Sequence, residues 1–251
     1  MAEINALDLA FIVDTTGSMG GLISAAQQQM ISMMNELVHA AEVEMRLGVV
    51  EYRDHPPQDK LVFRTYDFTS SLDHAQQTIN QLKAEGGGDG PESVLDGVLA
   101  ACQKLSWRPH ARRIAVLVGD APPHGVESKG DGFPEGCPCG ETIESVTAVA
   151  EEARVTLYAL GLTPWVSDSF TKLSALTGGE FFEAGQGDKA IERLKAILVS
   201  EFGSLEFDRR VLAEHQAQPD SGINDLVERL ASSRPAVSAA LSRLGTRGLL
   251  Q

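Results

Sequence analysis

The chain of 251 residues has few cysteines and no long apolar stretch, and each shortage excludes a class of protein. Three cysteines are an odd number, and two of them stand close together as Cys137-Pro138-Cys139, so a disulfide framework is excluded. No run of about 18 apolar residues is present, and we therefore expect no membrane span. The amino terminus lacks the basic and apolar regions of a secretory signal, so we expect a cytoplasmic protein.

Positive charge is also scarce. The chain has 35 acidic and 21 basic residues, and its net charge of -14 disfavours non-specific binding of nucleic acid by the main body. Residues 220–251 differ, because four arginines oppose three acidic residues there. The carboxyl-terminal segment therefore differs electrostatically from the rest of the chain.

Motifs of several enzyme classes are missing. No Gly-Lys-Ser/Thr follows a glycine-rich loop, and neither Gly-x-Ser-x-Gly nor His-Glu-x-x-His occurs. Hydroxyl residues follow Asp14 where a phosphotransfer site would place a second acid. A metal with open positions can activate water, which keeps a metal-assisted hydrolase as an alternative. No evident general base accompanies such a metal, and we expect a non-catalytic protein.

Apolar runs of strand length alternate with helical patterns, which predicts an α/β fold with a mainly parallel sheet. Strands are expected at residues 7–14, 45–52, 61–68, 113–119, 156–162 and 180–183. Helices are expected at residues 21–41, 72–84, 92–105, 142–153, 169–176 and 189–202. The first and fourth strands are nearly continuous apolar runs, as central strands are. The loop between the second and third strands is too short for a parallel crossover, so these two should be antiparallel.

Oxygen-bearing side chains follow three of the predicted elements. Asp14, Thr16 and Ser18 follow the first strand, Asp89 precedes a helix in a glycine-rich turn, and Asp120 ends the fourth strand. Each cluster alone is most simply explained as a helix cap or a flexible turn. Together they fall where the carboxyl ends of adjacent strands meet, which is where open α/β sheets bind ligands. Hard divalent cations prefer such oxygen ligands, so we expect a cation site there.

Three motifs carry a resemblance to von Willebrand factor type A (vWA) domains over residues 4–203. Asp14-Thr15-Thr16-Gly17-Ser18 resembles the Asp-x-Ser-x-Ser motif of their metal-ion-dependent adhesion site (MIDAS), with Thr16 in place of the first serine. Gly119-Asp120-Ala121-Pro122 resembles the fourth-strand aspartate loop. Gly88-Asp89-Gly90-Pro91-Glu92 resembles an intracellular variant in which aspartate replaces threonine. Tyr52-Arg53-Asp54 and Ala121-Pro122-Pro123-His124-Gly125 look closest to bacterial and alpha-kinase-associated members.

The resemblance implies a Rossmann-like three-layer sandwich of six strands, with one antiparallel edge strand and helices on both faces. It implies a module that binds Mg²⁺ or Mn²⁺ and presents the ion to a protein partner, whose acidic side chain often completes the metal shell. The implied metal residues are Asp14, Thr16, Ser18, Asp89 and Asp120. The extra anion at Asp89 should raise metal affinity and weaken capture of an acidic ligand.

The longest irregular stretch, residues 121–140, should shape the rim of this site. It carries His124, Cys137 and Cys139, which can bind Zn²⁺, although the paired spacing of a tetrahedral site is incomplete. Arg53 and Asp54 end the second strand on the same edge and should support the loops as a pair. An alternative role for Arg53, Asp54 and His124 is contact with a partner.

The regular alternation ends near residue 203, so we expect a domain at 1–203, a helix and linker at 204–222, and a small helical appendage at 223–251. The appendage resembles the helix-turn-helix core of winged-helix regulators, with Ser232 or Ser233 as the cap of its second helix. Arg234, Ser238 and Arg243 would then contact DNA. The small net charge of this segment weakens that alternative, and packing on protein is the other explanation.

Overall fold

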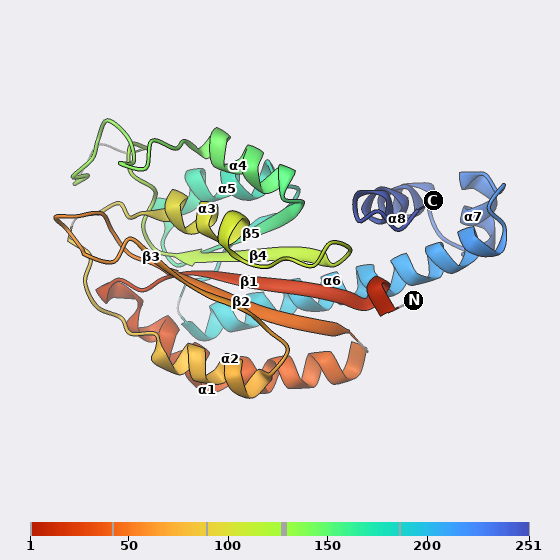
Figure 1. Ribbon diagram of the computed structural model, residues 1–251, viewed down its shortest axis with the longest axis horizontal. Helices are drawn as coiled ribbons and strands as arrows, with labels where there is room; N and C mark the ends of the chain where they lie inside the picture. The colour runs from red at the N-terminus through yellow and green to blue at the C-terminus, as the bar shows by residue number, and fades with distance from the viewer. Residues whose placement is uncertain (1, 42, 89, 127–129, 186, 251) are drawn as a thin grey trace.

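Six strands form one sheet in the order β3-β2-β1-β4-β5-β6 (Figure 1). The computed structural model describes residues 2–41, 43–88, 90–126, 130–185 and 187–250. The strands are β1 (Ala6–Asp14), β2 (Glu44–Tyr52), β3 (Phe63–Thr69), β4 (Arg112–Gly119), β5 (Val155–Gly161) and β6 (Phe181–Glu183). All neighbours are parallel except β2 and β3, which are antiparallel. The predicted sheet, with its antiparallel edge strand, is confirmed.

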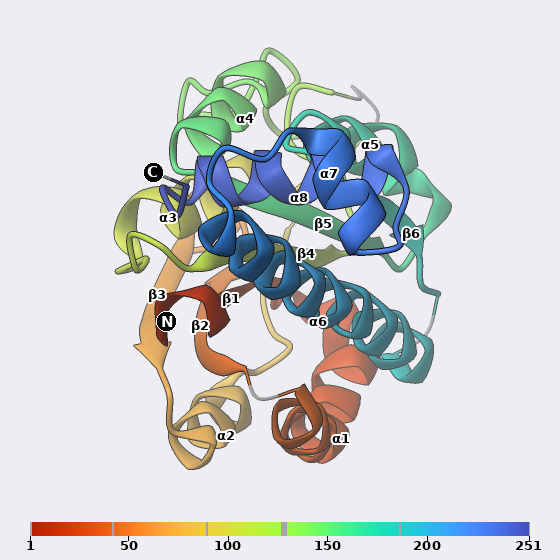
Figure 2. The same cartoon turned by 90° about the vertical axis from the view of Figure 1, so that its right-hand side faces the viewer.

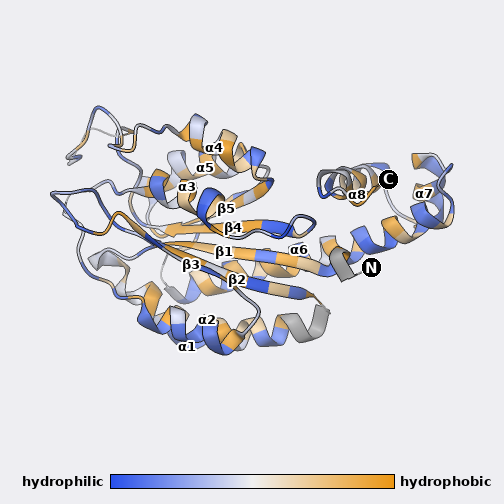
Figure 3. Cartoon of the chain, viewed as in Figure 1, coloured by the Kyte–Doolittle hydropathy of each residue, from blue (hydrophilic) through white to orange (hydrophobic). Residues whose placement is uncertain are grey.

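The centre of the sheet is formed by β1 and β4, as their apolar sequences predict. Every residue of β1 is buried, and the last six residues of β4 are buried as well. Such strands must be covered on both faces, because apolar side chains alternate between the two sides of a sheet. Figure 3 shows the resulting apolar colouring along both strands.

Helices cover the two faces of the sheet in two layers (Figures 1 and 2). One layer holds α1 (Gly20–Ala41), α2 (Leu72–Gln81) and α6 (Gly187–Ala217), and the other holds α3 (Val94–Lys104), α4 (Ile143–Glu152) and α5 (Ser167–Ala175). Each layer packs its apolar side chains against one face of the sheet, which gives two separate cores. None of the described helices is long and apolar enough to cross a membrane.

The last helix of the sandwich is longer than predicted. The sequence predicts an end at residue 202, but α6 continues through Gly203 to Ala217, so the expected domain boundary falls inside this helix. A glycine within a helix costs roughly 0.5–1 kcal/mol relative to alanine. Burial of Phe202 and Leu205 on either side offsets that cost, since each removes a large apolar side chain from water.

The extension of α6 carries the carboxyl-terminal helices α7 (Ile223–Arg229) and α8 (Arg234–Thr246). A third apolar cluster joins them to α6 and to the amino terminus; it contains Ile4, Val211, Leu226, Leu230, Val237, Ala240 and Leu244. Ser233 caps α8 by accepting a hydrogen bond from the Ala236 amide, as predicted. This appendage lies beyond the amino-terminal ends of the central strands, at the opposite end of the sheet from the carboxyl-terminal loops (Figure 1).

Candidate metal centre

The turn after β1 folds three oxygen-bearing side chains onto one another. Oδ1 of Asp14 accepts hydrogen bonds from the amide of Thr16 at 2.8 Å and from its hydroxyl at 2.7 Å. The Thr16 hydroxyl lies 3.4 Å from the hydroxyl of Ser18, in the short 3-10 helix Gly17–Met19 that leads into α1. The predicted Asp-x-Thr-x-Ser motif is therefore a compact cluster of oxygens at the carboxyl end of a central strand.

Asp120 joins this cluster from the neighbouring strand. It follows β4, which pairs with β1 along its length, and its carboxyl group lies close enough to that of Asp14 for the two charges to interact. Gly119 permits this approach, because a Cβ there would stand only 2.5 Å from the Tyr52 hydroxyl and 3.5 Å from Cβ of Asp14. Ser18 and Asp120 also line one hollow of about 450 Å³, which gives the cluster access to solvent.

Within the described part of the chain, no ion pair neutralises the carboxylates of the cluster. Burial and the charge of Asp120 outweigh the hydrogen bonds from Thr16 and raise the pKa of Asp14 to about 7. Among the described residues, Oδ2 of Asp14 is a buried oxygen without a hydrogen-bond partner. A divalent cation beside these carboxylates would remove both penalties, because an opposite charge favours the ionised form. Two carboxylates with two hydroxyls are also the donors that a hard divalent cation takes, so the residues present fit such an ion.

Glu92 is a further acidic residue near the cluster and is not among the predicted metal residues. The predicted helix begins at Glu92, but α3 begins at Val94, which leaves Glu92 in the loop. A Cβ on Gly87 would lie 3.1 Å from Oε1 of Glu92 and 3.2 Å from Cβ of Thr16, so these two side chains flank Gly87. Together with Asp14 and Asp120, Glu92 raises the pKa of the buried Tyr52 hydroxyl, after burial itself. The sequence feature that could have indicated Glu92 is its position as a second acid three residues after Asp89.

The predicted ligand Asp89 lies outside the described residues. The preceding part of its loop is fixed against the turn after β1 by two backbone hydrogen bonds, from Gly17 to the Gly86 carbonyl at 3.2 Å and from Glu85 to the Thr15 carbonyl at 3.0 Å. The third predicted motif therefore approaches the other two, and the role of Asp89 remains a prediction.

Arg53, Asp54 and His124 support the loops around the cluster from inside. Their exposed fractions are 8%, 0% and 2%, which favours the supporting role over direct contact with a partner. Arg53 donates to the Thr15 hydroxyl at 3.1 Å and to Glu85 at 3.2 Å, while Asp54 accepts from His124 at 2.7 Å. The predicted pair of Arg53 with Asp54 is therefore replaced by two separate pairs that hold different loops.

Two of the residues predicted to contact DNA are exposed to solvent, and the third forms an ion pair within the protein. Arg234 and Ser238 are exposed on α8. Arg243 instead pairs with the buried Asp208 of α6, with 2.6 Å between Nη2 and Oδ1. The guanidinium of Arg243 thus holds α8 on α6, which reduces the positive surface available to a phosphate backbone.

The fold and the cluster define a Rossmann-like α/β domain with an oxygen-rich cluster of side chains at the carboxyl ends of its strands. A family model described as von Willebrand factor A domain matches residues 8–127. The matched part of the chain, residues 8–127, is therefore similar to vWA domains.

Relatives agree with this assignment. The chain is 30% identical over 143 residues to alpha-protein kinase vwkA of Dictyostelium discoideum, covering 56% of this chain and 23% of that protein. It is 34% identical over 96 residues to human von Willebrand factor A domain-containing protein 7, covering 38% and 10%. The chain thus spans less than a quarter of the length of these relatives.

A solved structure has the same fold. Proximal thread matrix protein 1 of the mussel byssus, solved with a zinc-occupied MIDAS motif, matches with a TM-score of 0.53 and 16% identity, covering 77% of this chain and 46% of that one. At this identity the likeness shows the fold alone.

Proposed function

We propose that this protein is a non-catalytic interaction module that binds a protein partner through a divalent cation, Mg²⁺ or Mn²⁺. The observation that carries the proposal is the buried Asp14 carboxyl group, which has an oxygen without a partner and lies beside Asp120. Two hydroxyls, from Thr16 and Ser18, complete the cluster. Asp14, Thr16, Ser18 and Asp120 would hold the ion, and Asp89 is proposed as a fifth ligand.

The two hydroxyl ligands favour capture of an acidic side chain, while a carboxylate from Asp89 would weaken it. Hydroxyl ligands add no negative charge, so a bound cation would keep the ability to attract a carboxylate from a partner. The hollow lined by Ser18 and Asp120 gives that carboxylate a route to the ion. Mg²⁺ usually keeps several waters in protein sites, and one of these is what a partner would replace.

The non-catalytic part of the proposal is supported by what surrounds the cluster. Glu92 and Tyr52 are buried near it, and each is enclosed by the loops of this edge. Arg53 and His124 are both engaged in fixed pairs. The matched relative from Dictyostelium is a kinase, but the matched part is under a quarter of its length, so we do not extend its activity to this chain.

The experiment is a selection of displayed random peptides on the immobilised protein in Mn²⁺, with elution by EDTA. We expect the selected peptides to share an Asp or Glu whose replacement by Asn or Gln abolishes binding. Asp120→Asn should lose these peptides. Asp188→Asn is the matched control, because Asp188 borders the same hollow but is exposed and pairs with Gln29. Peptides that bind equally well in EDTA, or equally well to Asp120→Asn, would contradict the proposal.

A further inference from the structure

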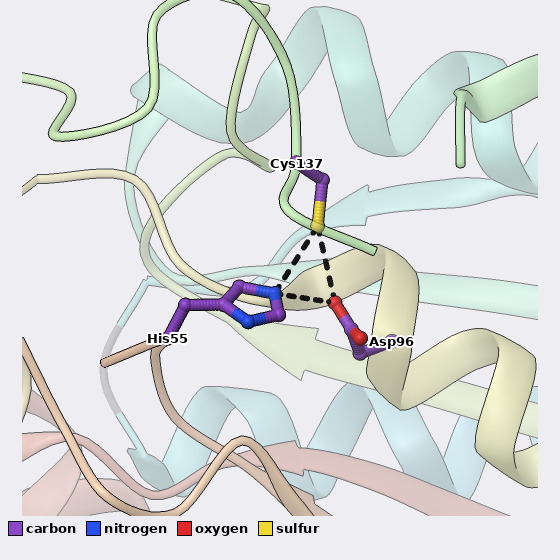
Figure 4. Close-up of side chains that lie close together, drawn as sticks. All are labelled: His55, Asp96 and Cys137. Carbon is purple, nitrogen blue, oxygen red and sulfur yellow. Dashed lines mark hydrogen bonds and ion pairs between the residues drawn. The ribbon is translucent and has the colours of Figure 1, made fainter. Parts of the chain in front are cut away.

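Three metal-binding side chains that the cation site does not use meet beneath the loop before α4 (Figure 4). His55 comes from the loop after β2, Asp96 from the first turn of α3, and Cys137 from the long loop. Nε2 of His55 lies 2.9 Å from Oδ2 of Asp96 and 3.3 Å from Sγ of Cys137, and the latter two atoms are 3.1 Å apart. In Figure 4 the three donor atoms point toward one another.

A fourth donor lies beside them. Sγ of Cys139 is 2.8 Å from Sγ of Cys137, and its side chain is half-buried. A disulfide would require about 2.05 Å between the sulfurs, and both cysteines are free thiols. The cluster therefore offers one nitrogen, one carboxylate oxygen and two sulfurs from three separate segments of the chain.

This donor set matches Zn²⁺, which binds four ligands tetrahedrally through Cys, His and Asp side chains. Bonds of about 2.0–2.3 Å place the donors of such a site about 3.3–3.8 Å apart. The separations among His55, Asp96 and Cys137 are 2.9, 3.1 and 3.3 Å. His55, Asp96 and Cys137 need to move apart only by about half an ångström to admit the ion. Cys139 stands outside this group of three, and its sulfur must move away from that of Cys137 by about 1 Å to complete the shell.

The surroundings favour a bound cation. His55, Asp96 and Cys137 are 8%, 8% and 7% exposed, so a carboxylate and the thiols share a largely dry space. The ring of Phe133 packs edge-on against His55 with 5.9 Å between centroids and closes one side. Buried anionic donors of this kind are stable when they are paired or coordinate a metal.

We propose that His55, Asp96, Cys137 and Cys139 form a structural Zn²⁺ site, distinct from the cation site at Asp14. The ion ties together the end of β2, the start of α3 and the loop between β4 and α4. That loop has little regular structure, and its turns use four glycines with positive φ: Gly125, Gly130, Gly136 and Gly140. Metal binding supplies folding free energy to segments that cannot build a core of their own, so this site fixes the loop that follows Asp120.

The test is the zinc content of the full chain. Protein freed of metal by a chelator is reloaded with Zn²⁺, and bound zinc is measured after gel filtration together with affinity by competition with a chromogenic chelator. The wild type should hold one zinc per chain tightly. Cys139→Ser, at the half-buried position, should fold normally and bind at least about 100-fold more weakly, since loss of an outer partner alone costs 10–100-fold. Cys102→Ala is the control, because Cys102 is a thiol of α3 outside the cluster.

Two further arms locate the ion. Co²⁺ in place of zinc should give the sulfur-to-metal charge-transfer band and the intense visible bands of a tetrahedral thiolate site, and Cys139→Ser should lose the charge transfer. Asp14→Asn should keep the tight zinc. A zinc that disappears in Asp14→Asn but persists in Cys139→Ser would place the ion in the other site and overturn the proposal. A wild type that binds no zinc, or whose Cys137 and Cys139 are found as a disulfide by mass, would also overturn it.

Discussion

Nε2 of His124 lies 2.7 Å from Oδ1 of Asp54, and its other ring nitrogen lies 2.8 Å from Oδ1 of Asp131. The imidazole thus bridges the end of β2 and the long loop, and its side chain is fully buried. Burial alone would lower the pKa of His124, but the bonds and charges of Asp54 and Asp131 outweigh it and raise the pKa. The loop beside Asp120 is therefore held by the His124 ring between two carboxylates, which favour its protonated form.

This bridge predicts a pH dependence of stability. Because the folded pKa of His124 is raised, its contribution is fully present below the unfolded value of about 6.5 and is lost as pH rises through the folded value. Urea unfolding from about pH 6 to about pH 9 should show that His124→Gln costs most stability at the acidic end of this range. His74→Gln is the control, since His74 is exposed on α2. A cost that is the same at both ends would contradict this assignment.

Glu92 should contribute to the field at the cation site without being one of the predicted ligands. Glu92→Gln removes one negative charge next to Thr16 and Gly87, and Mn²⁺ should bind about three- to tenfold more weakly. The matched control is Glu85→Gln, an exposed acid of the same loop that pairs with Arg53. Mn²⁺ titrations of both variants at the same salt concentration should show a larger loss of affinity for Glu92→Gln than for Glu85→Gln. Equal losses would indicate only a general effect of charge and would contradict this prediction.

Gly203 and Gly179 have different surroundings, so replacing each with alanine should change the stability of the protein in opposite directions. At Gly203, in the exposed side of α6, nothing lies within 4 Å of an added Cβ, and Gly203→Ala should stabilise the protein by about 0.5–1 kcal/mol. At Gly179 an added Cβ would meet the Leu157 carbonyl oxygen at 2.0 Å, and Gly179→Ala should destabilise it by about 2 kcal/mol or more. Urea unfolding measures both, and a neutral Gly179→Ala would contradict the packing described between β5 and the turn before β6.

The sheet and the oxygen cluster could be predicted because local patterns determine them. Continuous apolar runs place β1 and β4 in the centre, and the short loop after Tyr52 makes β3 antiparallel. Asp14, Thr16 and Ser18 stand within one turn, so their proximity follows from the sequence alone.

Other features depend on contacts between distant segments. Asp96 is 41 residues and Cys137 is 82 residues after His55 in the chain. Only the packing of α3 under the long loop brings these three side chains together. The continuation of α6 past Gly203 depends on burial against α8 and Ile4, which no local propensity reveals. Arg53 likewise pairs with Thr15 and Glu85 and not with its sequence neighbour Asp54, because the fold brings those two distant residues to it.

The central claim is that Asp14, Thr16, Ser18 and Asp120 hold one divalent cation. The most direct measurement is a Mn²⁺ titration followed by the electron paramagnetic resonance of the free ion, because Mn²⁺ prefers oxygen ligands to thiolates. Wild type and the control Asp188→Asn should each bind one Mn²⁺ per chain with equal affinity. Asp120→Asn should bind at least about tenfold more weakly, since it removes a charge beside Asp14. Equal affinity in Asp120→Asn and the wild type would contradict the account.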